Sequence, residues 1–362
     1  MAALDTVATP RAKQTYDALR ARIASSACGV PLPSVAEIRS ELGVSQDTVA
    51  KAFAVLEQEG LIERKRRKGV FVADPLKRTG EIAIVLSQVH LSKHASPFYA
   101  RQCAHLRQQL HAVNPRWTVK LHLGVSTVPG PDLPVTLDLL DPTVLPRLRG
   151  VLSFVGLFEV GVRLAEAGVS VVYFAAQPTS NAATVCLDHD QMLRDGIRHL
   201  ADVGCRNVCL LSTRYIGTKP VGRDPVPVAA AAAAACGLRF RNEWIGHEEG
   251  GWGERHGYDL FMRVWDQGAR PDGVLVSDDV LCHGVLRAIQ ERQVNLPRDL
   301  RLVTNANRGF DFPYPRPVSR VEFDLDVMAD KAVRMLETLC KGQKLKQTVE
   351  RVRPVLVKGE TT

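Results

Sequence analysis

The strongest chemical signal in the chain is a run of five consecutive cations from Arg64 to Lys68, followed by Gly69. Short apolar segments at Leu61-Ile62 and Val70–Val72 flank this run, and they predict the two strands of a hairpin with the cations at its tip. Adjacent like charges repel one another unless an anion lies close by, and a nucleic-acid backbone supplies a row of anions. We therefore expect the hairpin tip to contact phosphates.

A helix start with polar side chains precedes the hairpin. Gly43 ends one short helix, because glycine adopts positive φ easily, and Ser45 is a suitable N-cap for the next. On that next helix Val49, Phe53 and Leu56 are spaced to face a core. The opposite side of its first turns has the residues that we expect at base edges or phosphates: Gln46, Asp47, Ala50 and Lys51. Such a helix fits the major groove of DNA.

Two earlier helices complete this N-terminal module. Apolar residues recur at helical spacing in both, with Tyr16, Leu19 and Ile23 in the first and Val35, Ile38 and Leu42 in the second. The order of three helices and a basic hairpin resembles the winged helix-turn-helix of the GntR family of bacterial repressors. The stretches that match the family's pattern are Leu32–Ala36, Val44–Ala50, Leu56–Leu61 and Gly69–Val72.

The resemblance implies DNA binding, with one departure. The family has arginines where this chain has Ala36, Gln46 and Ala50, so the family's operator sequence does not carry over. Gln46 can still read adenine through two hydrogen bonds, and the basic hairpin favours phosphate contacts as a large part of the affinity. The DNA-binding residues that we predict are Ser34, Ser45, Gln46, Asp47, Thr48, Lys51, Arg64, Lys65, Arg66, Arg67, Lys68 and Gly69.

Composition is consistent with a multidomain cytoplasmic protein. The chain has 362 residues, 45% of them hydrophobic, which suggests two or three domains. Residues 1–80 have 13 Lys+Arg against 9 Asp+Glu, and the other 282 residues have 34 against 30. Each part therefore has a net charge of +4, and the net positive charge per residue is much higher in the first part. The eight cysteines include no C-x-x-C pair, which indicates reduced thiols. We see no signal peptide and no membrane span.

A larger region follows a charged, proline-containing linker. We place the DNA-binding domain at 1–73, the linker at 74–80 and a two-lobed ligand-binding and dimerisation domain at 81–362. Short apolar strands alternate with helices there, which predicts an α/β fold with parallel sheets flanked by helices. The strands are expected near 81–86, 118–123, 150–155, 170–174, 183–187, 207–211, 273–276 and 300–304. The helices are expected near 97–112, 158–167, 189–203, 253–266, 279–293 and 325–340.

Two segments fit this alternation poorly. Val125–Pro146 is rich in proline and aspartate where a helix is expected, so we interpret it as an irregular excursion or a lid. Ala229–Ala235 is a run of seven alanines, which strongly favours a helix but offers little side chain for packing or binding. Pro225 and Pro227 precede it and are tolerable in a first helical turn.

A second resemblance covers roughly Gly80 to Val357. The stretches Cys186–Ser212, Gly250–Val303 and Pro317–Gly342 are similar to the effector domain of the LacI/GalR repressors, which itself resembles periplasmic sugar-binding proteins. A GntR-type head on such a body resembles the arabinose-repressor subgroup of bacterial regulators. The resemblance implies a periplasmic-binding-protein-like fold with a small ligand between two lobes.

The same resemblance implies a set of ligand-binding residues: Phe98, Asp190, Gln191, Arg223, Trp252, Asp278, Asn305 and Asn307. Trp252 corresponds to a ring-stacking tryptophan and Asp278 to a ligand-binding asparagine, while Asn305 and Asn307 stand where the family usually has an aspartate. Trp252 is alternatively a packing residue, and Phe98 and Tyr99 face either the cleft or the core. We expect Asp279 to cap the following helix.

Motifs for catalysis are missing from the sequence. His90, His94, His105, His111 and His122 lack the spacing of a metal site, and there is no phosphate-binding loop or nucleophile elbow. Adjacent carboxylates such as Asp278-Asp279 usually point apart, which makes them a poor acid–base pair. GntR heads also occur on aminotransferase-like bodies, but no convincing lysine-centred motif is present. We therefore expect no enzyme, no cofactor and no metal.

Taken together, the sequence predicts a bacterial, ligand-responsive transcription regulator, a repressor that binds a pseudo-palindromic DNA operator as a homodimer. A sugar-like effector would close the lobes and so change the affinity for DNA. Two alternatives stay open. One is a sugar-binding module with a secondary or degenerate DNA-binding head, which the missing arginines favour and the basic hairpin opposes. The other is activation, or repression that needs a corepressor.

Overall fold

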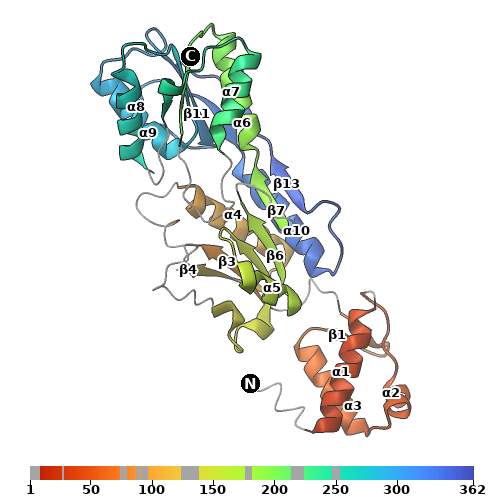
Figure 1. Ribbon diagram of the computed structural model, residues 1–362. Coiled ribbons are helices and arrows are strands. Elements are labelled where there is room, and N and C mark those ends of the chain that lie inside the picture. Colours follow the sequence, from red (N-terminus) through yellow and green to blue (C-terminus); the bar gives the residue numbers. More distant parts are fainter. Residues whose placement is uncertain are drawn as a thin grey trace.

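The chain folds into a small N-terminal domain and two α/β lobes (Figure 1). The computed structural model describes residues 9–26, 28–73, 80–86, 90, 97–123, 138–175, 182–212, 224–246 and 253–362. The predicted α/β class with parallel sheets flanked by helices is confirmed. Among the described residues no helix is both long and apolar enough to cross a lipid bilayer.

The N-terminal domain, which we call the head, has the helices and hairpin expected from the sequence. Its elements are α1 (Pro10–Ala24), α2 (Val35–Leu42), α3 (Gln46–Gln58), β1 (Ile62–Lys65) and β2 (Gly69–Val72). Ser34 and Ser45 cap α2 and α3 with their hydroxyls, and Gly43 ends α2 with a positive φ of 62°. The core of the head contains Phe53, which is 1% exposed. Local capping and helical periodicity together therefore account for the head.

The first lobe is a six-stranded parallel sheet in the order β13-β7-β6-β5-β3-β4. The strands are β3 (Gly80–Leu86), β4 (Trp117–Leu123), β5 (Leu148–Ser153), β6 (Ser170–Phe174), β7 (Ala183–Leu187) and β13 (Val349–Val352). Its helical elements are α4 (Phe98–Val113), η4 (Asp138–Leu140), η5 (Leu145–Arg147), α5 (Phe158–Glu166) and α10 (Leu325–Cys340). Successive residues of β3 belong to different core clusters, because helices cover both faces of the sheet.

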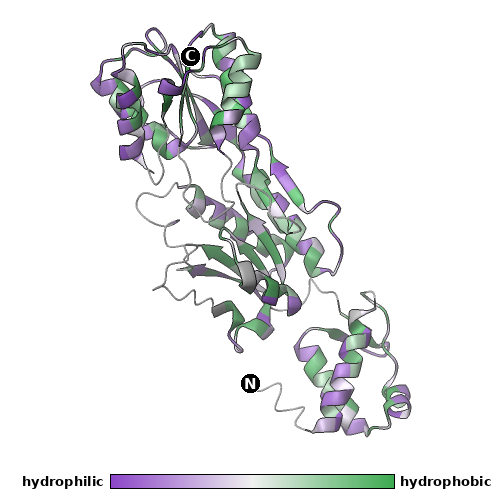
Figure 2. Cartoon of the chain, viewed as in Figure 1, coloured by the Kyte–Doolittle hydropathy of each residue, from purple (hydrophilic) through white to green (hydrophobic). Residues whose placement is uncertain are grey.

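The second lobe repeats this plan with the strand order β14-β12-β11-β10-β8-β9. The strands are β8 (Val208–Leu211), β9 (Ile245–Gly246), β10 (Gly273–Val276), β11 (Arg301–Asn307), β12 (Ser319–Phe323) and β14 (Val355–Val357), of which β14 pairs antiparallel with β12. The helical elements are α6 (His189–Asp202), α7 (Pro225–Ala235), η6 (Asn242–Trp244), α8 (Glu254–Trp265) and α9 (Asp279–Glu291). The central strands of both sheets are mostly hydrophobic (Figure 2), as burial on two faces requires.

The chain passes between the lobes three times within the described residues. The passages run from β7 to α6, from β12 to α10 and from β13 to β14. One buried core cluster includes residues of both lobes, such as Ile84 in β3 and Val303 in β11. The carboxyl ends of the two sheets are joined through these passages, and ligands of open α/β sheets bind at such ends.

Several expected boundaries need correction. Arg64 and Lys65 belong to strand β1 and pair across the hairpin with Val70 and Gly69, so the turn itself contains only Arg66 to Lys68. The strands β9, β12, β13 and β14 were not among the predicted elements. Gly80, expected in the linker, begins β3, and residues 74–79 lie outside the described residues. The alanine run does form a helix, α7, which Asp224 caps.

The predicted cap at Asp279 is wrong. Asp278 is the N-cap of α9, since its Oδ1 accepts the Leu281 N–H at 3.0 Å, and Asp279 is the first helical residue. Asp279 is buried, and its Oδ2 accepts a hydrogen bond from Asn307 Nδ2 at 3.1 Å. Strand β10 ends at Val276 and α9 begins at Asp279, so the residue just before the helix, which is the N-cap, is Asp278. In the segment 125–146, residues 125–137 lie outside the described residues, and the remainder includes the short turns η4 and η5.

Candidate functional site

The outer side of α3 is the first half of a candidate DNA-binding surface. Gln46 and Asp47 are exposed at the start of the helix, as the sequence predicted, and Ala50 lies one turn later. Lys51 Nζ lies 2.8 Å from Asp47 Oδ2, so this cation already has an anionic partner. Gln46 is therefore the exposed polar side chain of this turn with the freedom to form two hydrogen bonds to a base.

The predicted serine and threonine contacts have structural roles in this domain. Ser34 accepts the Glu37 N–H, and the Glu37 carboxylate accepts the Ser34 N–H at 2.7 Å, which forms a capping box. This hydrogen bonding lowers the pKa of Glu37. The Ser45 hydroxyl caps α3 and lies 2.8 Å from the Thr48 hydroxyl. These two serines and Thr48 therefore fix the starts of α2 and α3.

The hairpin of β1 and β2, which we call the wing, divides its five cations into two classes. Arg64 Nε lies 2.9 Å from Glu57, and Lys65 Nζ lies 2.7 Å from Glu63. These two cations also lie over the rings of Phe53 and Phe71, at 5.9 and 4.7 Å. Arg64 and Lys65 are thus partly neutralised and held against the head.

The turn of the wing holds the second class of cations. Arg66, Arg67 and Lys68 are exposed, and no ion pair involves them in the part of the chain that the structure describes. The Lys68 N–H donates to the Lys65 carbonyl at 2.9 Å, and Arg67 has a φ of 62°, which is unusual for a long side chain. A tight turn therefore presents three adjacent free cations, the arrangement that binds a phosphate backbone.

A second candidate site lies at the carboxyl edge of the first lobe's sheet. Four aromatic residues follow the ends of strands β3, β5 and β6 and contact one another: Phe98, Tyr99, Phe154 and Phe174. Phe154 stacks on Phe174 with ring centres 4.2 Å apart, and the rings of Phe98 and Tyr99 approach Phe154 edge-on at 6.3 and 5.8 Å. His90 stacks on Tyr99 at 4.1 Å. We call this set, with His90, the aromatic wall.

Electrostatics keep the aromatic wall neutral. Burial lowers the pKa of His90 to about 4, so its imidazole is uncharged at neutral pH. Burial, with the nearby charges of Asp278 and Asp279, raises the pKa of Tyr99 to about 12, so its hydroxyl stays protonated. Asp278 and Asp279 belong to the second lobe, as the N-cap and first residue of α9, so their influence on Tyr99 fits a wall that is turned towards that lobe.

The opposing edge of the second lobe is rich in acceptor atoms. Asp278 and Asp279 follow β10, while Asn305 and Asn307 end the neighbouring strand β11. Burial and the charge of Asp279 raise the pKa of Asp278 to about 7. Asn305 and Asn307 are 6% and 5% exposed, and the amide oxygen of each has no hydrogen-bond partner among the described residues. We call these four residues the acceptor group.

A contact between α4 and the second lobe joins the two lobes beside these residues. Arg101 donates from Nη1 to the Gly309 carbonyl at 2.8 Å and lies 5.2 Å from the centre of the Phe310 ring. Arg101 follows the aromatic wall on α4, and Gly309 follows the acceptor group after β11. The two edges are therefore brought together by a contact between residues that are distant in the sequence.

The structure assembles part of the ligand-binding set that the sequence suggested. Phe98 lies in the aromatic wall, and Asp278, Asn305 and Asn307 lie in the acceptor group. Asp190 and Gln191 occupy the first turn of α6 on an interlobe passage, where Asp188 Oδ1 accepts the Gln191 N–H at 3.1 Å and Gln191 Nε2 donates to Asp195 at 2.8 Å. Arg223 and Trp252 lie outside the described residues.

Sequence reasoning missed four members of the site: His90, Arg101, Phe154 and Phe174. Phe154 and Phe174 stand at the ends of predicted strands, where side chains reach a ligand edge, and this position is the signal that could have revealed them. Arg101 has no such signal, because its partner Gly309 is distant in sequence.

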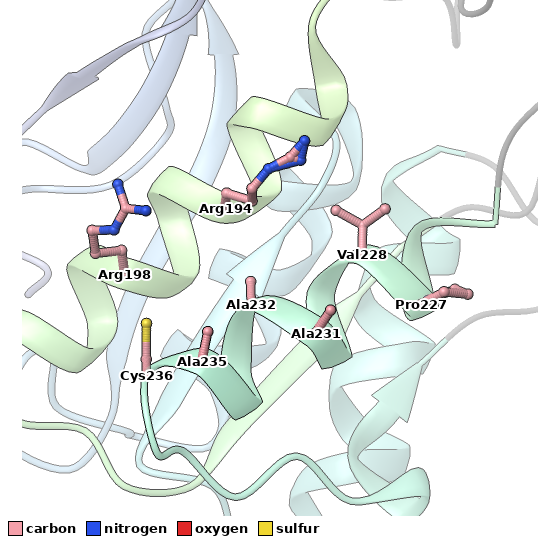
Figure 3. Close-up of a pocket in the computed structure, with 8 residues that line it drawn as sticks. All are labelled: Arg194, Arg198, Pro227, Val228, Ala231, Ala232, Ala235 and Cys236. Carbon is pink, nitrogen blue, oxygen red and sulfur yellow. The ribbon is translucent and has the colours of Figure 1, made fainter.

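A separate hollow of about 380 Å³ lies between α6 and α7 (Figure 3). Its lining is formed by Arg194, Arg198, Pro227, Val228, Ala231, Ala232, Ala235 and Cys236. Figure 3 shows the arginines on α6 and the small side chains on α7. Since seven of the eleven residues of α7 are alanine, the hollow follows from the small volume of those side chains. No aromatic-wall or acceptor-group residue lines it.

Known families match both parts of this architecture. Residues 11–72 match the family described as bacterial regulatory proteins, gntR family, and residues 197–362 match the periplasmic binding protein-like domain. The chain thus joins a GntR-type helix-turn-helix head to a periplasmic-binding-protein-like effector domain, as the two resemblances predicted.

Individual relatives share these parts. The lactose operon repressor of Escherichia coli (strain K12) is 23% identical over 209 residues, 56% of this chain and 54% of that protein. The HTH-type transcriptional repressor YtrA of Bacillus subtilis (strain 168) is 34% identical over 64 residues, 17% of this chain and 49% of that protein. The chain thus spans about half the length of the curated relatives it matches.

Among solved structures, the complex of the transcriptional regulator CelR with cellobiose is similar in fold. Its TM-score is 0.63 at 17% identity, and the match covers 91% of this chain and 100% of that chain. The relatives named here are described as repressors or regulators of transcription, not as enzymes.

Proposed function

We propose that this protein is a bacterial transcription regulator that represses its target genes and responds to a small molecule. The observation that carries the proposal is the head, in which three free cations of the wing lie beside an exposed α3. The cations suit phosphates and Gln46 suits a base edge, so one surface combines affinity with sequence preference. A protein that acts on bacterial DNA works in the cytoplasm, and we place it there.

The proposed regulator acts as a homodimer. A two-fold axis would set two heads on two half-sites of a pseudo-palindromic operator. Strand β4 supports self-association, because it is an edge of the first lobe's sheet and has two exposed leucines on one face, Leu121 (45% exposed) and Leu123 (51% exposed). Edge strands with exposed apolar residues readily pair with another copy.

The effector is proposed to bind between the aromatic wall and the acceptor group. A ligand in contact with both lobes stabilises their closed arrangement, and it changes DNA affinity only as far as its affinity differs between the open and closed states. Such coupling is typically about 1–3 kcal/mol. The lactose repressor and the CelR–cellobiose complex, which share the fold, favour a sugar or sugar derivative as the ligand.

A selection from random duplex DNA tests the proposal and yields the operator sequence in the same experiment. The full-length protein should enrich an inverted repeat with half-sites about 10 base pairs apart, centre to centre. The matched control is the variant in which Arg66, Arg67 and Lys68 are all alanine, which should enrich nothing. Recovery of unrelated sequences by both proteins would contradict the proposal and favour a ligand-binding module with a degenerate head.

The sign of the response is tested with the selected operator. Addition of an effector should release the DNA if the protein is a repressor that the effector induces. Tighter binding on addition of the effector would instead indicate a corepressor or an activator.

A further inference from the structure

We propose that the interlobe site recognises a protonated amino group, so that the effector is a cationic amine, such as an amino sugar, and not a neutral or acidic sugar. The inference rests on the proposed function, which supplies the ligand between the lobes, and it names the chemical class of that ligand. Two independent features of the described residues carry it: the acceptor group on one lobe and the aromatic wall on the other.

The acceptor group lacks hydrogen-bond donors for its amide oxygens. Asp279 receives hydrogen bonds from Asn307 Nδ2 and from the Val280 N–H, yet the amide oxygens of Asn305 and Asn307 stay unsatisfied within the described residues, although both asparagines are more than nine-tenths buried. A buried acceptor without a donor is costly, so a ligand that donates would be favoured there. An ammonium group provides three donors and no acceptor, which matches this surface better than a hydroxyl does.

Charge in the site points the same way. Asp278 is half-buried and its neighbour Asp279 is buried, and the repulsion between the two carboxylates contributes to the raised pKa of Asp278. A cation between the lobes would relieve that repulsion, whereas a carboxylate or phosphate would increase it.

Four basic groups on elements that border the site are engaged elsewhere or uncharged. Arg101 is directed to the Gly309 carbonyl and the Phe310 ring, and Arg308 is paired with Glu322 and Asp324. On the facing lobe, burial lowers the pKa of His90 to about 4, and it also lowers the pKa of His189 at the start of α6. A cationic ligand would therefore not compete with these groups for the acceptor group.

The aromatic wall distinguishes an organic cation from a metal ion. Ring faces attract cations, and sites for alkylammonium groups are commonly built from several aromatic side chains. A divalent metal ion keeps its water or binds oxygen atoms, and it gains little from Phe98 or Phe154. Within the described residues no group of three or more acidic, histidine or cysteine side chains is arranged to hold a metal. In an amine with an apolar or sugar skeleton, the ammonium group can bind the acceptor group while the skeleton packs against the aromatic wall.

A thermal-shift measurement on the full-length protein tests the inference with matched probes. The panel contains the hexosamines glucosamine, galactosamine and mannosamine, the corresponding neutral hexoses, their N-acetyl derivatives and their uronic acids, together with ethanolamine, choline and calcium chloride. At least one amine should raise the melting temperature, while its neutral, acetylated and acidic counterparts should not. Ligand binding to the folded state produces the shift.

Two variants locate the binding. Asp278→Asn keeps the cap of α9, because asparagine is also a good N-cap, but removes the charge, so it should lose most of the shift caused by the amine. Phe154→Leu keeps an apolar side chain but removes the ring, and it should weaken amine binding several-fold. Asp202→Asn, which alters an exposed carboxylate in the last turn of α6, is the matched control and should retain the full shift.

Three outcomes would overturn the inference. These are an equal or larger shift with a neutral or acidic sugar, a shift only with calcium, and the absence of a shift with every amine. Retention of the amine's shift by Asp278→Asn would also overturn it. Failure of the proposed function is separate, because it is read from DNA selection with the same preparation: a regulator with a neutral effector still enriches an operator.

Discussion

The division of the wing cations into paired and free classes predicts how DNA binding depends on salt. Replacement of Arg66, Arg67 and Lys68 by alanine removes the three cations that have no ion pair among the described residues, whereas Arg64 and Lys65 are compensated by Glu57 and Glu63. Each lost phosphate contact reduces the slope of log K against log salt by about 0.9. The triple variant should therefore lose about 2.7 in slope per subunit and about 5.4 for the proposed dimer.

The measurement is fluorescence anisotropy of a labelled random duplex, titrated with each protein at a series of salt concentrations. Random DNA suffices because phosphate contacts do not depend on sequence. The matched control replaces three exposed cations of the effector domain, Lys344, Lys346 and Arg353, and should leave the slope unchanged although the net charge falls equally. The Glu57→Gln and Glu63→Gln double variant frees Arg64 and Lys65 and should steepen the slope.

Two results would refute this reasoning. A triple variant whose slope matches that of the unaltered protein would mean that the wing does not meet phosphates. An equal loss of slope in the control would mean that net charge, not the position of the wing, governs binding.

Three further predictions concern Asp278 between the lobes, the edge strand β4 and Gln46 on α3. Burial and the charge of Asp279 raise the pKa of Asp278 from 3.8 to about 7. Between these two pH values the folded protein keeps a proton on Asp278 that the unfolded chain has lost. The free energy of unfolding therefore falls as the pH rises through this range. Asp278→Asn should accordingly melt above the unaltered protein at pH above 7, with a difference that shrinks as pH falls towards 4 in calorimetry; a pH-independent difference would exclude the charge as its cause. Leu121→Asp with Leu123→Asp should convert the proposed dimer to monomer in sedimentation, while Val162→Asp, which alters an exposed valine of α5, should not; an unchanged mass would contradict the proposal that β4 forms the dimer surface. Gln46→Ala should relax the preference at one base pair by about 1–3 kcal/mol, seen as a change in the selected sequence, and a uniform loss on all sequences would mean that Gln46 does not read a base.

The sequence predicted the elements whose signals are local. The helices of the head follow from periodic apolar residues and from caps at Ser34 and Ser45, which act within one helical turn. The parallel strands β6, β7 and β10 begin and end where predicted, because short apolar runs bounded by polar residues recur along the chain. The alanine run forms α7 for the same reason, since alanine has the highest intrinsic helix propensity.

Crossover strands were less visible to sequence reasoning. Strands β12, β13 and β14 are short. β13 pairs with the distant strand β7, and β14 joins β12 from beyond α10, so no local pattern specifies these partners. The choice between Asp278 and Asp279 as the helix cap likewise depended on where β10 ends. Two adjacent aspartates have nearly the same local preference for the N-cap position, so long-range packing determines which of them occupies it.

The sequence by itself determined that a basic hairpin follows a helix-turn-helix and that an α/β body follows the head. Only the tertiary structure decided which wing cations are free, because the partner of Arg64 is Glu57 on α3. Only the tertiary structure also set Phe154 beside Tyr99 and Phe174, and Asn307 beside Asp279. Charge compensation and burial depend on groups that are distant along the chain, and these contacts exist only after the sheets and lobes have formed.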